Sequence, residues 1–316
     1  MNTEIIYHIQ SGPYWDWRVA LDLFLGGAGA GAILFAILVE EGFKGKYRRV
    51  CRTAAWLSPL LVTAGLLLLM SKMGRPFDLF LAYTNFNPTA PLWWGGVFQP
   101  LLIVGAFIYA FKWPKSQLQD PGHKWLGRVL APLALIVGAY HGLLLTVMVS
   151  RPLWNTGPTV VASLLGFAST GIAVVMLVHL LRMKVAGRLA DKEHVAEFLH
   201  DMHGVRNILA AILILQLGTS FLWWLSLKLG ALQDQQALAA ANNVYGPTFW
   251  GLGIGLGLIL PLALGAYAVI RSGAKESRIE VAMIGLTSIL ILVGGYFFRL
   301  TVLLGGQGPF PTTIAF

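Results

Sequence analysis

Long apolar runs recur along the whole chain, separated by short polar connections. Eight of them are about 15 to 24 residues long, which suits a bilayer core about 30 Å thick. They lack the alternation of membrane-barrel strands, so the need to satisfy backbone hydrogen bonds in lipid leaves α-helices. The predicted spans are 19–39, 54–70, 97–111, 129–149, 158–181, 208–229, 249–270 and 281–304.

Composition agrees with this pattern. Of the 316 residues, 56% are hydrophobic and only 12% are charged, which leaves too little polar surface for a soluble globular protein. The first run lacks a basic leader and a small-residue cleavage site, so we expect a true span there and not a cleaved signal. We therefore predict an all-α integral membrane protein, with residues 1–316 forming one polytopic domain.

Basic residues concentrate in alternate connections, and this bias predicts the orientation in the membrane. The basic connections are expected to be cytoplasmic, which places both termini on the outer, periplasmic side of a bacterial inner membrane. The net charge of +9 follows from this topology, so no nucleic-acid partner is needed. The residues concerned are Lys44, Lys46, Arg48, Arg49, Arg52, Lys112, Lys115, Lys124, Arg128, Arg182, Lys184, Arg188, Lys192, Arg206, Arg271, Lys275 and Arg278.

Polar residues interrupt the outer part of the first predicted span. Asp22 follows Arg18 by four residues and therefore shares its helical face. The two residues either form an ion pair or leave Asp22 as a proton-transfer group. Asp16 lies at the membrane interface, where it suits the start of a helix.

Several basic residues lie at the outer ends of predicted spans. Lys72 and Lys228 are expected to extend their charges to the lipid headgroups, whereas Arg75 and Arg151 are candidates for a site. Arg299 differs from these because its segment, GGYFFRLTVLLGGQ, is apolar on both sides. A buried arginine needs an acidic, carbonyl or ligand partner, so Arg299 is also a site candidate.

The fourth predicted span contains Tyr140 and His141 and ends at an Arg-Pro pair. Tyr140 precedes Arg151 by eleven residues, or roughly three helical turns, so the two should share one face about 16 Å apart. That arrangement suits an elongated apolar ligand or a polar path, while His141 points about 100° away. Either residue alone would be explained by a bond to a neighbouring helix, but together they favour a site.

Cysteine and histidine positions limit the cofactors that the protein could hold. The single cysteine, Cys51, rules out an iron–sulfur cluster. His141 is near the middle of its span and His179 near the cytoplasmic end of the next, so paired haem ligation is not expected. The remaining histidines are assigned to loops or the N-terminal extension, and HVAEFLHDMH is interpreted as a solvated cytoplasmic helix without a metal site. They are His8, His123, His194, His200 and His203.

Glycine-rich stretches have a packing explanation. GGAGAG at 26–31 lies inside an apolar span, with no preceding strand and no following Lys-Ser/Thr, so it is predicted to be a helix-packing surface and not a phosphate loop. Gly251, Gly253, Gly255 and Gly257 are expected to allow another close helix approach, and Pro261 to kink the same span.

Three segments carry a family resemblance: YWDWRVALDLFLGGAGAG, GAYHGLLLTVMVSRPLWNTG and GGYFFRLTVLLGGQ. With them the sequence resembles the NrfD/PsrC family of membrane quinol-oxidoreductase subunits. The resemblance implies two four-helix bundles, no haem, and a quinone site toward the outer face, where a ferredoxin-like iron–sulfur subunit docks. It implies quinone contact for Tyr140 and matches Arg151 and Arg299 to recurrent arginines. Asp22 replaces a residue that is neutral in many members, so the quinone-facing group of the first span is Asp16, Asp22 or Arg18.

These observations give a functional expectation. The polar residues and the resemblance together predict that the protein binds menaquinone or ubiquinone, and the resemblance implies that it exchanges electrons with the iron–sulfur subunit and, through it, with a molybdopterin subunit or a multihaem cytochrome. Tyr140, Asp22 and His141 are predicted to handle the head group and its protons. The predicted cofactor-binding residues are Asp16, Arg18, Arg75, Arg151, Trp154, Asn155 and Arg299. The alternatives are a haem-free secondary transporter and a di-haem cytochrome b-type anchor.

Overall fold

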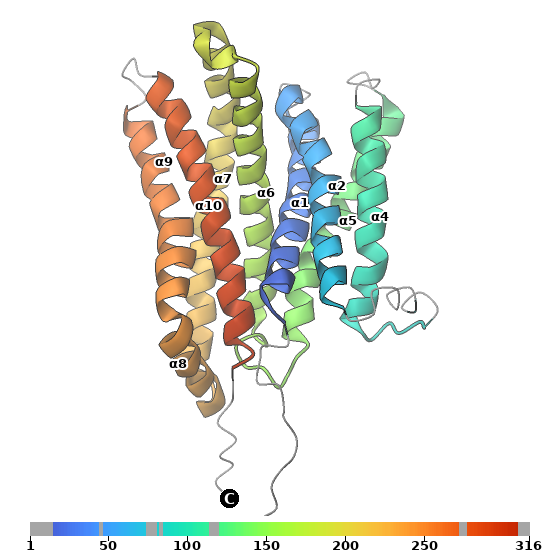
Figure 1. Ribbon diagram of the computed structural model, residues 1–316, viewed down its shortest axis with the longest axis vertical. Helices are drawn as coiled ribbons and strands as arrows, with labels where there is room; N and C mark the ends of the chain where they lie inside the picture. Colours follow the sequence, from blue (N-terminus) through green and yellow to red (C-terminus); the bar gives the residue numbers. More distant parts are fainter. Residues whose placement is uncertain are drawn as a thin grey trace, which may run out of the picture.

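A computed structural model describes residues 15–43, 47–73, 81, 85–113, 120–271 and 277–308. Within them every regular element is helical, and eight stretches are long and apolar enough to cross a membrane (Figure 1). This confirms the predicted all-α membrane class. The elements are α1 (Trp17–Gly42), α2 (Arg48–Lys72), α4 (Pro91–Lys112), α5 (Pro121–Thr146), α6 (Gly157–Val185), the 3₁₀ turn η2 (Arg188–Ala190), α7 (Lys192–Lys228), α8 (Leu232–Gly246), the π-helix η3 (Pro247–Ile259), α9 (Leu260–Arg271) and α10 (Ser277–Gly305).

The eight candidate membrane spans among the described residues pack as two neighbouring bundles (Figure 1). In the first bundle α1 packs against α2 and α5, and α4 closes the ring between them. In the second bundle α6 packs against α7 and α10, and η3 with α9 closes the ring. Contacts of α1 with α6 and α10, and of α5 with α6, join the two bundles. The two predicted four-helix bundles are therefore present.

Small residues let α1 lie deep between the bundles. A methyl group added at Gly31 would overlap the backbone oxygen of Phe167 in α6, and one at Gly171 would lie 2.6 Å from the backbone of Ala32. On another face of α1, a methyl group added at Gly29 would lie 2.6 Å from Cγ2 of Val62 in α2. This confirms that the glycine-rich stretch is a packing surface, because only helices without Cβ atoms at the contact approach so closely.

Several helices begin earlier in the sequence than predicted, at residues that suit the start of a helix. The third span begins earlier than predicted, since Pro91 occupies the first turn of α4, a position that suits proline. The sixth span begins at Lys192 because the side chain of Asp191 accepts a hydrogen bond from the backbone N–H of Glu193. At 37 residues α7 is about 55 Å long, so it extends well beyond a bilayer core and includes the predicted cytoplasmic histidine helix.

The seventh span departs most from the prediction. Residues 232–246, expected to form an outer connection, are the helix α8, and a π-helix follows directly. The π-helix, and not the predicted kink at Pro261, is thus the departure from regular α-helix in this span. Pro261 lies in the first turn of α9. Gly253 and Gly257 approach the backbone of α10 closely, whereas nothing lies within 4 Å of a methyl group at Gly251.

The two described ends of the polypeptide lie together at one end of the molecule. The backbone N–H of Trp15 donates to Oε1 of Gln307 at 2.7 Å, and Nε2 of Gln307 donates to the backbone oxygen of Trp15 at 2.8 Å. Trp15 and Gln307 therefore lie at the same end of the helix bundles, and the placement of both termini on one side of the membrane stays a prediction. That this side faces the periplasm remains a prediction from the charge bias.

Candidate functional site

Several of the predicted site residues lie at one depth in the bundle. Asp22 is five residues from the start of α1, Tyr140 is six from the end of α5, and Arg299 is six from the end of α10. At about 1.5 Å per residue, each lies roughly 8 to 9 Å inside the end of the molecule that holds the described termini. We call Asp22, Gln99, Tyr140, His141 and Arg299 the polar layer.

Asp22 is buried with 3% of its surface exposed, and its Oδ1 has no hydrogen-bond partner among the described residues. The carboxyl group faces α2, where a methyl group on Gly65 would lie 2.9 Å from Oδ1. Burying a polar atom without a hydrogen bond is costly, and intramembrane ionisable residues are usually functional. Asp22 thus provides an unused hydrogen-bonding atom within the membrane.

Arg18 forms no ion pair with Asp22, which corrects one of the two alternatives for these residues. Its Nη2 lies 2.8 Å from Oδ2 of Asp16, and Nζ of Lys72 lies 3.2 Å from the same oxygen. Asp16 also accepts a hydrogen bond from the backbone N–H of Arg18 and so caps α1. The Arg18 hydrogen bond and the nearby Lys72 hold the pKa of Asp16 at about 2.

Tyr140 is buried with its ring against α4. A methyl group at Gly95 would overlap the end of the phenol ring, so this glycine makes the space that the ring occupies. The ring centroids of Tyr140 and His141 are 5.2 Å apart. The two neighbouring residues are therefore in contact despite pointing in different directions from the helix.

His141 is held at the contact between α1, α4, α5 and α6. Its Nε2 lies 3.1 Å from Nε2 of Gln99, and because an amide nitrogen donates, the ring nitrogen accepts. Its ring packs edge-on against Phe167, and a methyl group at Gly26 would lie 3.2 Å from Cε1. Gly26 is one helical turn from Asp22, so the carboxyl group and the imidazole lie on one face of α1.

Arg299 lies between the two bundles. Its guanidinium group is 5.5 Å from the ring centroid of Phe24 and 5.4 Å from that of Phe167, and Nη1 donates to the backbone oxygen of Gly295 at 2.9 Å. Among the described residues, no carboxylate forms an ion pair with Arg299, and its buried Nη2 atom has no hydrogen-bond partner. The predicted carbonyl partner is present, and one donor remains available for a ligand.

A cavity of about 40 Å³ connects the polar layer to the second bundle. His141 and Arg299 line it from opposite bundles, together with Thr159 and Gln216. This volume is enough for a few water molecules, and apolar side chains such as Leu23, Phe167 and Val302 form most of the remaining wall. The cavity therefore brings polar groups from both bundles to the edge of one small space.

Two buried amides in this region were not among the predicted site residues. Gln99 bonds His141, and Oε1 of Gln216 accepts a hydrogen bond from Oγ of Ser169 at 2.8 Å. Both glutamines are at most 2% exposed. Each stands alone in an apolar run, VFQPLL and LILQLG, and that isolation was the available signal.

The segment after α5 changes the interpretation of Arg151. α5 ends at Thr146, so Arg151 lies in a turn and, contrary to the prediction, does not share a helical face with Tyr140. Its Nη1 lies 3.4 Å from the backbone oxygens of Gly306 and Gly308. Arg151 thus fastens this turn to the end of α10.

Trp154 and Asn155 follow in the same turn. Trp154 is 2% exposed, donates from Nε1 to the backbone oxygen of Val302 at 2.8 Å, and stacks on Trp15 at 5.4 Å. Asn155 is exposed, and its backbone N–H bonds the oxygen of Arg151. Neither residue belongs to the polar layer. Arg75, the remaining predicted site residue, lies outside the described residues.

The histidine positions are only partly as expected. His141 is close to the end of α5 rather than mid-span, while His179 is near the opposite end of α6, so the two are too far apart to ligate one haem. His123, predicted to lie in a loop, is buried in the first turn of α5 and stacks on Tyr109 at 4.1 Å. The described residues contain no His, Cys, Asp and Glu group able to hold a metal ion.

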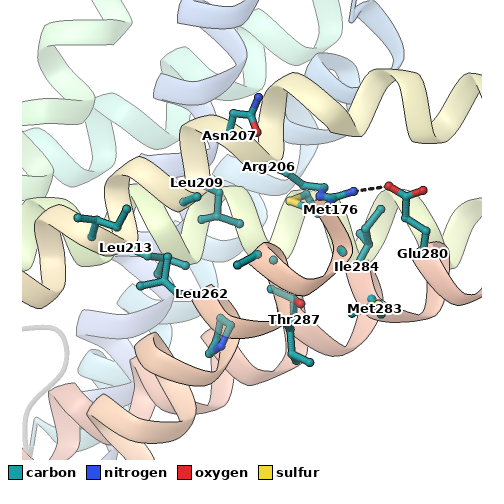
Figure 2. Close-up of a pocket in the computed structure, with 17 residues that line it drawn as sticks. Met176, Arg206, Asn207, Leu209, Leu213, Leu262, Glu280, Met283, Ile284 and Thr287 are labelled. Carbon is teal, nitrogen blue, oxygen red and sulfur yellow. Dashed lines mark hydrogen bonds and ion pairs between the residues drawn. The ribbon is translucent and has the colours of Figure 1, made fainter. Parts of the chain in front are cut away.

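A larger cavity, of about 240 Å³, lies in the second bundle (Figure 2). Apolar side chains including Leu213, Leu262 and Ile284 line it, and the ion pair between Arg206 and Glu280 forms part of its wall. Glu280 is three residues from the start of α10, toward the end opposite the polar layer. This apolar cavity is therefore separate from the predicted site residues.

Comparison with known proteins identifies a family and several relatives that match nearly the whole sequence. The family described as polysulphide reductase, NrfD, matches residues 7–311. The C subunit of polysulfide reductase from Wolinella succinogenes is 28% identical over 313 residues, covering 93% of this protein and 94% of that one. Protein NrfD of Escherichia coli is 27% identical over 332 residues, covering 97% and 99%. The protein therefore belongs to the polysulphide reductase NrfD family and is a multi-pass protein of the bacterial inner membrane.

Proposed function

We propose that this protein is the quinol-binding membrane subunit of a respiratory reductase complex, with the quinol head group bound at the polar layer. The observation that carries the proposal is the pair of unpartnered polar atoms there, Oδ1 of Asp22 and Nη2 of Arg299. A quinol hydroxyl donates to a carboxyl oxygen, and a quinone carbonyl accepts from a guanidinium group. The layer therefore suits both redox forms of the ligand.

The remaining residues of the layer fit the same role. Tyr140 supplies a phenol group at a contact between α4 and α5, and His141 supplies an imidazole whose orientation Gln99 sets. A quinol releases two electrons and two protons on oxidation. His141 and Asp22 are the groups in the layer that accept protons, and the cavity beside His141 is a route for water to remove them.

Electrons leave this subunit through a partner. A single cysteine cannot bind an iron–sulfur cluster, so a further polypeptide must carry the redox centres. The relative in Wolinella succinogenes is named as one of the polypeptides of polysulfide reductase, which is consistent with a multi-subunit enzyme. We propose a ferredoxin-like iron–sulfur subunit, followed by a molybdopterin subunit or multihaem cytochrome, docked at the end where the polar layer lies.

The direct test is quinol-dependent turnover of the complex carrying Tyr140→Phe and Asp22→Asn together. Loss of both polar groups should reduce turnover by roughly a hundredfold, a typical contribution for acid–base catalysis. Tyr267→Phe, an exposed tyrosine on α9, is the control and should keep wild-type turnover. Wild-type activity in the double variant would refute the residue assignment.

Purification of the protein from its native membrane in mild detergent tests the class of protein. Co-purification of quinone and an iron–sulfur protein is the expected result. A haem spectrum belonging to this subunit would instead indicate the cytochrome b alternative. A protein that purifies alone, without quinone but with a bound soluble substrate, would indicate the transporter.

A further inference from the structure

A cavity of about 630 Å³ lies where α2 of the first bundle meets α6 of the second, opposite the polar layer. Four arginines line it: Arg49 and Arg52 from α2, Arg182 from α6, and Arg188 from η2. No carboxylate is among the described residues of its lining. Four guanidinium groups around one cavity make a strongly positive site, which favours an anionic ligand.

Two of the arginines are held in place by other residues. Nη1 of Arg49 lies 2.6 Å from Oε2 of Glu197 in α7, and Nη1 of Arg182 donates to Oγ1 of Thr53 at 2.8 Å. Arg52 and Arg188 are exposed, and no described carboxylate forms an ion pair with either. The ion pair with Glu197 offsets one charge, so most of the positive charge at the cavity remains available.

The same cavity has an apolar wall. Leu181 and Val185 line it, and they are 47% and 89% exposed. They lie at the end of α6, close to the membrane surface that we predict to be cytoplasmic. A water-soluble anion would gain nothing from these side chains, whereas a lipid acyl chain would bury them.

We propose that this cavity binds an anionic phospholipid, with the phosphate group at the arginines and an acyl chain along Leu181 and Val185. Basic pockets between transmembrane helices on the cytoplasmic side are a known mode of binding such headgroups. Because α2 and α6 belong to different bundles, the bound lipid bridges them. The site is independent of the quinol site and needs no redox partner.

The test is native mass spectrometry of the delipidated complex titrated with dioctanoyl phosphatidylglycerol. Dioctanoyl phosphatidylcholine has the same acyl groups with a net neutral headgroup, and inorganic phosphate represents a soluble anion. Wild-type protein should bind phosphatidylglycerol at least tenfold more tightly than phosphatidylcholine. An excess of inorganic phosphate should not displace it.

Arg52→Gln and Arg188→Gln together should weaken phosphatidylglycerol binding by roughly ten- to thirtyfold. Lys184→Gln removes the same type of charge from the same end of α6 but lies outside the cavity lining, and should change binding less than twofold. Unchanged thermal unfolding without lipid would show that the double variant is folded.

Equal binding by the double variant and the wild type would overturn the proposal. So would equal affinity for the two phospholipids, because the headgroup charge would then be irrelevant. Displacement by inorganic phosphate at millimolar concentration would also overturn it, by identifying a site for a soluble anion. Failure of the quinol assignment would leave each of these outcomes unaffected.

Discussion

The side-chain amide of Gln99 bonds the imidazole of His141 and thereby joins α4 to α5 inside the membrane-spanning part of the first bundle. Gln99→Leu removes this bond and leaves Nε2 of His141 buried without a donor, at a cost of about 1–3 kcal/mol. We expect quinol turnover to fall by about tenfold. Gln236→Leu, at an exposed position in α8, should leave turnover unchanged. Normal turnover in Gln99→Leu would show that the bond does not position His141.

Trp154→Ala should destabilise the protein without directly affecting the polar layer. The substitution removes a buried ring, its bond to the backbone of Val302 and its stacking on Trp15, a change that typically costs about 3–5 kcal/mol. Thermal unfolding in detergent measures this loss, and Trp125→Ala, whose ring is 67% exposed, is the control. Normal stability with reduced quinone binding would instead place Trp154 at the ligand.

Gly31→Ala should weaken the contact between the two bundles. The new methyl group would overlap the backbone of α6, and such overpacking costs about 1–3 kcal/mol. Gly218→Ala places the same methyl group in α7, where nothing lies within 4 Å, and should be neutral or slightly stabilising. Equal unfolding temperatures for the two variants would contradict the close packing of α1 on α6.

The ion pairs of Asp16 with Arg18 and Lys72 predict a specific pH dependence. Its pKa is lowered from 3.8 to about 2, so the charged form stabilises the folded state above pH 4 and this contribution is lost as the pH falls toward 2. Wild type should therefore be more stable than Asp16→Asn at neutral pH, and the difference should shrink below pH 4. Unfolding temperatures measured from pH 7 to the lowest pH that the detergent tolerates test this. A difference that is constant across that range would exclude the ion pair as its cause.

Periodicity and length predicted most of the fold because membrane spans are constrained by the lipid. Asp22, Tyr140 and Arg299 were identified as individual polar residues in apolar runs, and their common depth follows from where each helix ends. Helical spacing left an ion pair between Arg18 and Asp22 as one of two alternatives, but Asp16 is also within reach of Arg18 at the helix cap and has two cationic partners. The spacing of residues along a helix does not show which of two nearby carboxylates, Asp16 or Asp22, binds the guanidinium group of Arg18.

Contacts between distant parts of the sequence were outside the reach of such reasoning. Gln99 and His141 are 42 residues apart, and no periodic pattern relates them. Arg151 was placed on a helical face because the apolar run continues past Thr146, although the backbone leaves the helix there. Hydrophobicity indicates what enters lipid, but it does not show where hydrogen bonding within a helix stops.

The mutual hydrogen bonds of Trp15 and Gln307 have a mechanical consequence. They connect the start of the first bundle to the end of the second, beside the turn in which Trp154 and Arg151 also fasten α10. The two bundles are thus cross-linked at the end that holds the proposed quinol site, and the ion pair of Arg49 with Glu197 and the hydrogen bond from Arg182 to Thr53 join them at the other end. Sliding or rotation of one bundle against the other is therefore restrained at both ends, and the proposed quinol site lies beside one of these fixed contacts.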